Sequence, residues 1–358
     1  MKLIFYCCIV FMLATGAAWA VQYTVTDLVT LGGEGGYASR AYGINDSGQV
    51  VGWADTATGD RHAFLYSGGV MTDLGTLGGD SSATNGINDS GQMSGSSYTS
   101  DGYHHALRYS GGAMHDLGTL LGDTWSAAWG INASGQVAGE SGTAESYDTH
   151  AVLYNSDGTM IDLGTFGGRI SCATGINNGG QVTGYSYFAD GHHHAFLYDY
   201  EDGTMTDLGT PFGYAYSDGQ CINNNGQVAG NARTSSGVTH AFLYSGGEMI
   251  DLGTLGGDSE AHGINDTGLI VGNSAGHAVL YSDGAVIDLN SRIDPATGWT
   301  LVYGTSINNR GQIVGFGYNA QGGGHAVLLN PVPEPATMAL LAPALLGFAG
   351  IAVKRMRK

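Results

Sequence analysis

Histidine and aspartate recur along the chain at regular intervals, and both side chains can ligate metals or carry out acid–base chemistry. An active site is usually one place, whereas a structural device appears in every copy of a repeat. We therefore predict that each His closes a turn or bonds backbone groups, and that each Asp accepts amide hydrogen bonds. The His-Ala pairs begin at His62, His105, His150, His194, His240, His277 and His325, and the Asp-Leu pairs begin at Asp27, Asp73, Asp116, Asp162, Asp207, Asp251 and Asp288.

Other motifs that could carry chemistry are incomplete. The Asn-Asp-Ser-Gly segments at 45–48 and 88–91 resemble fragments of calcium loops, but neither completes the pattern that ends in a Glu at the twelfth position. No Lys-Ser/Thr follows the Gly-Gly pairs, and the chain has no Gly-x-Ser-x-Gly. We therefore expect no catalytic residue, no metal and no cofactor, and we predict that the protein is not an enzyme.

One alternative stays open, a glycan-active hydrolase or lyase built on the same scaffold. Such an enzyme needs paired carboxylates. Two acidic pairs are available, Glu140 with Glu145 in the third repeat and Glu201 with Asp202 in the fifth. All four are predicted to be loop residues.

Aromatic residues gather in the one loop of the repeat that varies in length and content. Variable loops on a repeated scaffold are a usual place for binding specificity. Aromatic rings with few cations nearby suit stacking on sugar rings better than the capture of an anion. Simple drift of the loop sequence is the competing explanation. The candidate binding residues are Tyr98, Tyr103, Tyr147, Tyr187 and Phe188.

These motifs belong to a unit that occurs seven times. A Gly-Ile-Asn triplet or a close variant marks each copy, at spacings of 42 to 46 residues. Each copy predicts four short strands, joined by a tight turn after the isoleucine, by the variable loop and by a second tight turn. The seven isoleucines are Ile44, Ile87, Ile131, Ile176, Ile222, Ile264 and Ile307.

Four antiparallel strands in about 43 residues is the period of a β-propeller blade. The predicted fold class is therefore all-β, a seven-bladed β-propeller over residues 21–330. The last copy lacks its fourth strand, and residues 23–28 form an orphan strand of that type. Pairing the two would close the ring and leave no open sheet edge. A β-solenoid also explains a repeat, but it predicts atypical caps rather than complementary half-units.

Composition supports a folded, turn-dense chain. Of 358 residues 62 are glycine, which disfavours helices, and the 42% hydrophobic content is too high for a disordered chain. The formal charge is −19, and residues 21–330 hold seven arginines, no lysine and 30 of the 31 acidic residues. So acidic a chain is a poor candidate for binding nucleic acid through phosphate contacts.

The two ends carry membrane signals. Residues 1–20 have one cation, an apolar run and an Ala-x-Ala site at Ala18 and Ala20, which predicts a secretory signal peptide. Residues 336–353 are uncharged and nearly long enough to cross a bilayer as one helix. The basic tail at 354–358 would stay in the cytoplasm, so the middle of the chain would face outward. Cys172 and Cys221 would then be in an oxidising compartment, either as a disulfide or as two free thiols.

The C-terminal arrangement resembles the PEP-CTERM sorting signal. It consists of Pro333, Glu334 and Pro335 within the segment 331–335, followed by the apolar helix and the basic tail. The resemblance implies that an exosortase-type membrane protease recognises the triplet and releases or re-anchors the protein. The protein would be anchored by its helix facing the periplasm and then sorted to the cell surface or beyond.

The repeats resemble the bacterial extracellular HAF family, named for its His-Ala-Phe. Intact copies stand at residues 62–64, 194–196 and 240–242, and the resemblance covers about residues 22–330. It implies an exported repeat protein and brings no catalytic residues. Together, the two resemblances imply a structural or binding role near extracellular polysaccharide or biofilm matrix, with an extracellular glycan as partner.

Overall fold

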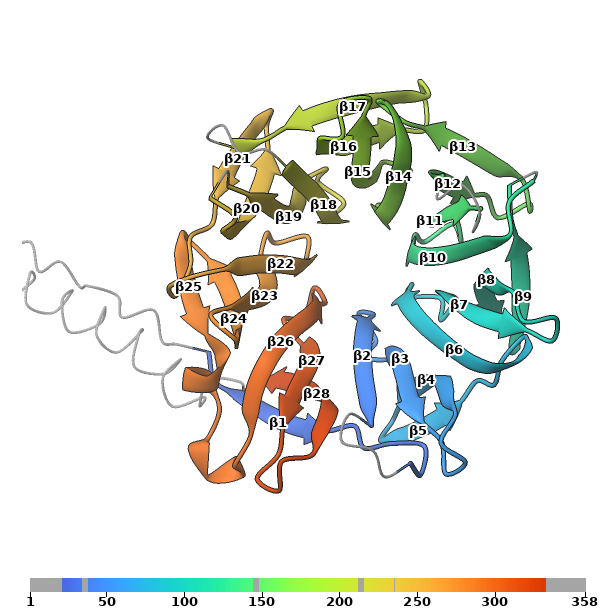
Figure 1. The fold of residues 1–358 in the computed structure, drawn as a ribbon. Helices are drawn as coiled ribbons and strands as arrows, with labels where there is room; N and C mark the ends of the chain where they lie inside the picture. Colours follow the sequence, from blue (N-terminus) through green and yellow to red (C-terminus); the bar gives the residue numbers. More distant parts are fainter. Residues whose placement is uncertain are drawn as a thin grey trace, which may run out of the picture. The chain divides into compact units, whose positions relative to one another are not determined.

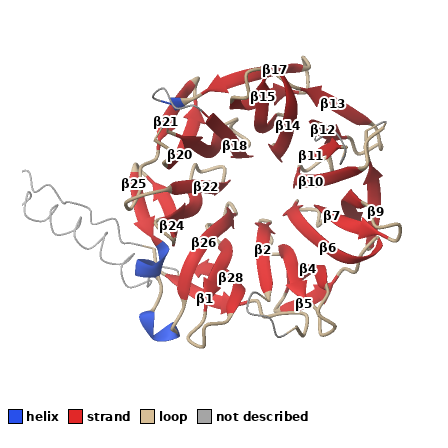
Figure 2. Cartoon of the chain, viewed as in Figure 1, coloured by secondary structure: helices blue, strands red, loops and turns tan. Residues whose placement is uncertain are grey.

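The computed structural model describes residues 21–33, 38–120, 122–143, 148–211, 216–234 and 236–332. They form strands and turns, with short 3-10 helices such as η2 (Leu289–Arg292) and η3 (Pro295–Thr297), and no α-helix occurs in these ranges (Figure 2). The all-β prediction is confirmed. None of the helical segments in the described ranges has the length and apolar character needed to cross a membrane. The predicted signal peptide, sorting motif, membrane helix and basic tail lie outside these ranges.

Consecutive strands pair antiparallel in groups of four, and each group corresponds to one sequence repeat (Figure 1). The first strand of each group lies nearest the centre. Repeats 1 to 3 contain β2 (Ser39–Ile44), β3 (Val50–Asp55), β4 (Arg61–Ser67) and β5 (Val70–Asp73); β6 (Gly78–Ile87), β7 (Met93–Thr99), β8 (His104–Ser110) and β9 (Ala113–Gly118); and β10 (Trp125–Ile131), β11 (Val137–Gly142), β12 (Thr149–Tyr154) and β13 (Met160–Gly164).

The next three repeats follow the same order. They contain β14 (Gly167–Ile176), β15 (Val182–Phe188), β16 (His193–Asp199) and β17 (Thr204–Gly209); β18 (Tyr216–Ile222), β19 (Val228–Arg233), β20 (Thr239–Ser245) and β21 (Glu248–Asp251); and β22 (Ser259–Ile264), β23 (Ile270–Ser274), β24 (His277–Ser282) and β25 (Ala285–Asp288).

Repeat 7 is assembled from both ends of the repeat region. Its first three strands are β26 (Thr300–Ile307), β27 (Ile313–Tyr318) and β28 (Gly324–Pro331), and its fourth is β1 (Tyr23–Asp27). β1 pairs antiparallel with β28, from Tyr23↔Pro331 to Asp27↔Val327. The predicted pairing of the orphan strand with the last repeat is confirmed. Single parallel bridges, Arg61↔Ser81 and Thr149↔Ile170, join repeats 1 and 2 and repeats 3 and 4 into eight-stranded sheets, whereas repeats 5, 6 and 7 each form a four-stranded sheet.

A buried asparagine after each repeat isoleucine joins one repeat to the next. In the first repeat, Asn45 Oδ1 accepts hydrogen bonds from the backbone of Ser47 (3.1 Å) and Gln49 (3.0 Å), which fixes the turn. Its Nδ2 donates to the carbonyl of Asn88 in repeat 2 (3.1 Å).

The same bond recurs at all seven junctions. It runs from Asn45 to Asn88, Asn132, Asn177, Asn223, Asn265 and Asn308 and from Asn308 back to Asn45, over 2.9 to 3.2 Å. We call this set the asparagine ring. These turns therefore have a structural role in hairpin capping and in linking repeats.

The hydrophobic core is divided into clusters between successive repeats. One such cluster joins Ile44 and Phe64 of repeat 1 to Val314 and Leu328 of repeat 7. Another joins repeats 6 and 7 and includes Ile293 from the long connection between β25 and β26. No single repeat buries its apolar faces alone, so each one depends on its neighbours.

We predict that Asn88→Ala lowers the free energy of unfolding by about 2–4 kcal/mol, because four hydrogen bonds are lost and buried backbone groups lose their partners. Urea denaturation of variant and parent measures the difference. The control is Ser90→Ala in the same turn, whose side chain is exposed, and it should change stability by less than about 0.5 kcal/mol. Equal effects of the two substitutions would refute the role of the asparagine ring.

Candidate functional site

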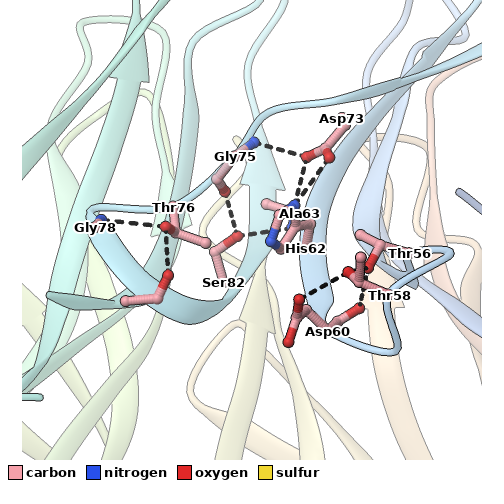
Figure 3. Close-up of polar contacts among 11 residues, drawn as sticks. Thr56, Thr58, Asp60, His62, Ala63, Asp73, Gly75, Thr76, Gly78 and Ser82 are labelled. Carbon is pink, nitrogen blue, oxygen red and sulfur yellow. Dashed lines mark hydrogen bonds and ion pairs between the residues drawn. The ribbon is translucent and has the colours of Figure 1, made fainter. Parts of the chain in front are cut away.

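The repeated His and Asp form pairs within each repeat, and Figure 3 shows the pair of His62 and Asp73 in repeat 1. His62 Nδ1 lies 2.9 Å from the Asp73 carboxylate, and Asp73 Oδ1 accepts a hydrogen bond from Gly75 N (2.7 Å). The prediction for Asp is confirmed. The prediction for His is wrong in its partner, because pairing of β4 with β5 brings the imidazole to the carboxylate rather than to the backbone. The other pairs are His105–Asp116, His150–Asp162, His194–Asp207, His240–Asp251, His277–Asp288 and His325–Asp27.

A buried serine connects six of the seven successive pairs of repeats. Ser82 Oγ accepts from Ala63 N (2.8 Å) and donates to Gly75 O (2.6 Å), and so joins β6 of repeat 2 to repeat 1 (Figure 3). The His-Asp pairs are therefore part of the joints between repeats. They also close the ring, since His325 and Asp27 come from opposite ends of the repeat region.

The candidate site is a central cavity of about 1000 Å³. Its walls are formed by the beginning of the first strand of each repeat and, in several repeats, by the end of the second strand. Because the variable loop follows the second strand, the cavity opens on the face of the variable loops. A smaller hollow of about 190 Å³ is lined by the repeat isoleucines and the asparagine turns at the other end of these strands. The two faces therefore differ, as the alternation of tight turns and variable loops predicts.

A β-bulge in every innermost strand contributes one side chain to this cavity. In repeat 1, Ala41 pairs with Gly52 and Gly43 pairs with Val51, so Tyr42 is left unpaired. A bulge of this kind redirects the side chain of the extra residue. The bulged residues are Tyr42, Asn85, Trp129, Thr174, Gln220, His262 and Thr305, and all seven line the central cavity.

A glycine in the second strand makes the bulge possible. A Cβ added to Gly52 would lie 1.9 Å from the carbonyl oxygen of Arg40, so no other residue fits without movement of the backbone. The corresponding glycines of the other six repeats are equally close to a carbonyl, at 1.8 to 2.2 Å. The residue after this glycine also faces the centre in several repeats, as Trp53, Ser96, Glu140, Tyr185 and Phe316 do.

Aromatic rings line part of the cavity. They come from repeats 7 and 1 to 4, and are Tyr303, Phe316, Tyr42, Trp53, Tyr98, Trp125, Trp129 and Tyr185. Trp129 is 38% exposed although it lies at the centre of the ring of repeats. Repeats 5 and 6 contribute polar groups, Gln220, Glu260 and His262.

The two cavity arginines lie against aromatic faces. The guanidinium of Arg61 is 3.7 Å from the centroid of Trp53, and that of Arg40 is 4.9 Å from the centroid of Phe316. Cation–π contacts of this kind hold each cation at its own wall. The cavity thus combines aromatic rings from five repeats with polar side chains from all seven, among them Asn85, His104 and Glu140.

Glu140 is a strand residue, and its prediction as a loop residue is wrong. It lies in β11, the predicted second strand of repeat 3, directly after Gly139. Its carboxylate accepts hydrogen bonds from Cys172 and Trp129, while burial raises its pKa. Burial, together with the nearby Glu140 charge, also raises the pKa of the Cys172 thiol.

The two predicted acidic pairs do not form a site in the described residues. Glu145, the predicted partner of Glu140, lies outside the described ranges. Glu201 and Asp202 occupy an exposed turn between β16 and β17, so they are loop residues as predicted but belong to repeat 4 and not to the fifth repeat. Cys172 and Cys221 are both free thiols.

Of the aromatic residues predicted in the variable loops, Tyr98, Tyr187 and Phe188 are strand residues, at the ends of β7 and β15, so that part of the prediction is wrong. Tyr98 lines the central cavity, and Tyr187 lines a second hollow beside it. Tyr103 lies in an exposed turn near His105, and Phe188 stacks on Phe166 with 5.0 Å between centroids. Tyr147 lies outside the described ranges. The sequence analysis missed most of the cavity residues. The signal that could have found them is a position whose residue type varies between repeats although the neighbouring glycine or isoleucine is constant.

Comparison with known proteins identifies the C-terminus and the fold. Residues 331–358 match the PEP-CTERM protein-sorting motif, which indicates an exported protein sorted at the cell surface. No curated protein matches the chain. The resemblance to HAF repeats stays a prediction.

Solved structures similar to this chain include two with a TM-score of 0.54. An oligogalacturonate lyase in complex with manganese is 10% identical, and the match covers 88% of this chain and 97% of the lyase. A puromycin-hydrolysing peptidase from Mycobacterium tuberculosis is 13% identical, with 82% and 52% covered. TolB from Acinetobacter baumannii is 11% identical at a TM-score of 0.47, with 82% of this chain and 64% of TolB covered. The chain thus spans less than two thirds of TolB and about half of the peptidase, and the likeness shows a propeller-like all-β fold alone.

We predict that Glu140→Gln removes a pH-dependent loss of stability. Because burial raises the pKa of Glu140 above its usual value of 4.5, the unfolded chain loses this proton first. The parent protein therefore loses stability as the pH rises from that value to the pKa in the folded state. The stability advantage of the variant should grow across this window and then level off, as measured by urea unfolding at a series of pH values. The exposed Glu201→Gln is the control, and a difference independent of pH for Glu140→Gln would contradict the prediction.

Proposed function

We propose that this protein is an exported seven-bladed β-propeller that binds extracellular polysaccharide without transforming it. The observation that carries the proposal is the central cavity, whose aromatic rings from repeats 7 and 1 to 4 lie together with polar side chains from every repeat. Four-stranded repeats and the asparagine ring, which returns from Asn308 to Asn45, support the count of seven blades.

A saccharide fits the chemistry of this cavity. Sugar rings offer apolar C–H faces to aromatic side chains and hydroxyl groups to polar ones. Gln220, Glu260 and His262 can accept or donate hydrogen bonds on the wall formed by repeats 5 and 6. The volume of about 1000 Å³ is large for a small-molecule site, whose usual range ends near ~1,000 Å³.

Charge favours a neutral saccharide over an anionic one. The chain carries a formal charge of −19, which repels polyanions. Both cavity arginines lie against aromatic rings, and Glu260 adds negative charge to the cavity. We expect the ligand to be a neutral glycan of the extracellular matrix.

The sorting signal supports a location where such glycans occur. We propose that an exosortase-type protease recognises Pro333, Glu334 and Pro335, and that the helix at 336–353 anchors the protein before processing. The repeat region ends with β28 immediately before this motif. The protein would then act at the cell surface or in the biofilm matrix.

A glycan array tests the proposal. The purified protein should bind neutral oligosaccharides, and Trp129→Ala should weaken binding at least about tenfold, which corresponds to ~1.4 kcal/mol. The control is Tyr103→Ala, which removes an aromatic ring that is 52% exposed and lies outside the cavity. Absence of binding across neutral and acidic glycans would overturn the proposal, as would equal binding by Trp129→Ala and the parent.

Glu140 supports a second candidate function, a glycan-active enzyme. A carboxyl group with a raised pKa inside a cavity is suited to donate a proton to a leaving group. Incubation of the bound glycan with the parent protein and with Glu140→Gln distinguishes the two functions. A binding protein leaves the glycan intact in both cases, whereas an enzyme yields products that the variant fails to form.

A further inference from the structure

A second hollow of about 480 Å³ lies beside the central cavity, over repeats 4 to 6. We call it the lateral pocket, and its principal residues are Tyr187, His193, Tyr216, Asp218, Asn231 and Arg233. Glu260 lines both the lateral pocket and the central cavity. The two hollows are therefore neighbours on the variable-loop face.

Aromatic rings connect the two hollows. Tyr185 belongs to the central cavity, and its ring centroid lies 5.7 Å from that of His193 in the lateral pocket. His193 lies 4.6 Å from Tyr187 and 4.9 Å from Tyr216, measured between ring centroids. These four rings form a continuous surface on which more than one sugar ring could stack.

Polar side chains of the lateral pocket are held in place before any ligand binds. His193 Nε2 lies 3.1 Å from the Asp218 carboxylate. Asn231 Oδ1 accepts a hydrogen bond from Ala261 N (2.9 Å). His193 Nδ1 is buried and has no hydrogen-bond partner in the part of the chain that the structure describes. The contacts with Asp218 and Ala261 fix the side chains of His193 and Asn231, and side chains that are already fixed lose less entropy when a ligand binds.

The lateral pocket has a composition that the other repeats do not share. The residue before each His-Ala pair is Arg61, His104, Thr149, His193, Thr239, Gly276 or Gly324. Only repeat 4 combines a histidine here with Tyr185 and Tyr187 in the preceding strand and a tyrosine, Tyr216, at the start of the next repeat. Structural devices of this fold occur in every repeat, so a cluster that occurs once needs another explanation.

We propose that the lateral pocket is a second sugar subsite and that the protein binds an internal segment of an extended neutral polysaccharide across both hollows. This inference rests on the proposed function of the central cavity, and it specifies the form of the ligand. A chain that lies over Tyr185 and His193 would place one residue in the central cavity and another between Tyr187 and Tyr216. A ligand limited to one terminal sugar would occupy only the central cavity.

The test uses arrayed neutral oligosaccharides in length series from monosaccharide to octasaccharide. For the parent protein, affinity should rise with length and then level off when both subsites are filled. Tyr187→Ala should lower the affinity for the longest oligosaccharides at least about tenfold relative to the parent. The affinity for the shortest ligands should stay unchanged. Tyr216→Ala is a second variant of the same pocket, and Tyr103→Ala is the control outside both hollows.

The outcomes separate this inference from the proposed function. Trp129→Ala should weaken short and long ligands alike, because it acts in the central cavity. Binding that is independent of length, or a parent-like length series for both Tyr187→Ala and Tyr216→Ala, would overturn the second subsite and leave the central site standing. Absence of binding at every length would overturn both.

Discussion

The side-chain amide of one asparagine in each repeat donates to the backbone carbonyl of its counterpart in the next, and the seventh donates to the first. Each of these asparagines is at least 93% buried, and its carbonyl oxygen also caps the turn that follows. A buried amide without partners is costly, so turn formation and contact with the next repeat are coupled. Every hydrophobic cluster lies between two repeats and depends on the same contact.

The glycine of the second strand imposes the other constraint. Its close approach to a carbonyl leaves no room for a side chain, and the neighbouring strand forms a bulge at the same level. Because the side chain of the bulged residue lines the cavity, its type can change without a change in the hydrophobic clusters between repeats. The repeat thus keeps its scaffold constant while the residues at the central cavity vary from Tyr42 to Asn85 to Trp129.

Much of the fold could be predicted from sequence because the same pattern of turns and strands recurs in every repeat. The period, the half-unit at each end and the tight turns indicate antiparallel strands and the pairing of β1 with β28. The site was harder to predict, since Trp129 reaches the cavity through a bulge whose register follows from three-dimensional packing, and Glu140 reaches it from the strand beside that bulge. Aromatic residues in loops were the visible signal, and they identified Tyr98 and Tyr187 but also Phe188, which packs on Phe166.

Repetition itself separates structural from functional residues in this molecule. The seven His-Asp pairs combine the side chains most associated with catalysis, yet they occur at every joint, and His325 with Asp27 completes the ring. Aromatic residues of the central cavity and the lateral pocket occupy equivalent positions in the repeat but differ from copy to copy. Selection for closure acts on all seven copies alike, whereas a ligand without sevenfold symmetry contacts each copy differently. Aromatic rings of the central cavity come from repeats 7 and 1 to 4, whereas repeats 5 and 6 contribute Gln220, Glu260 and His262. This uneven set of side chains on a sevenfold repeat points to an asymmetric ligand.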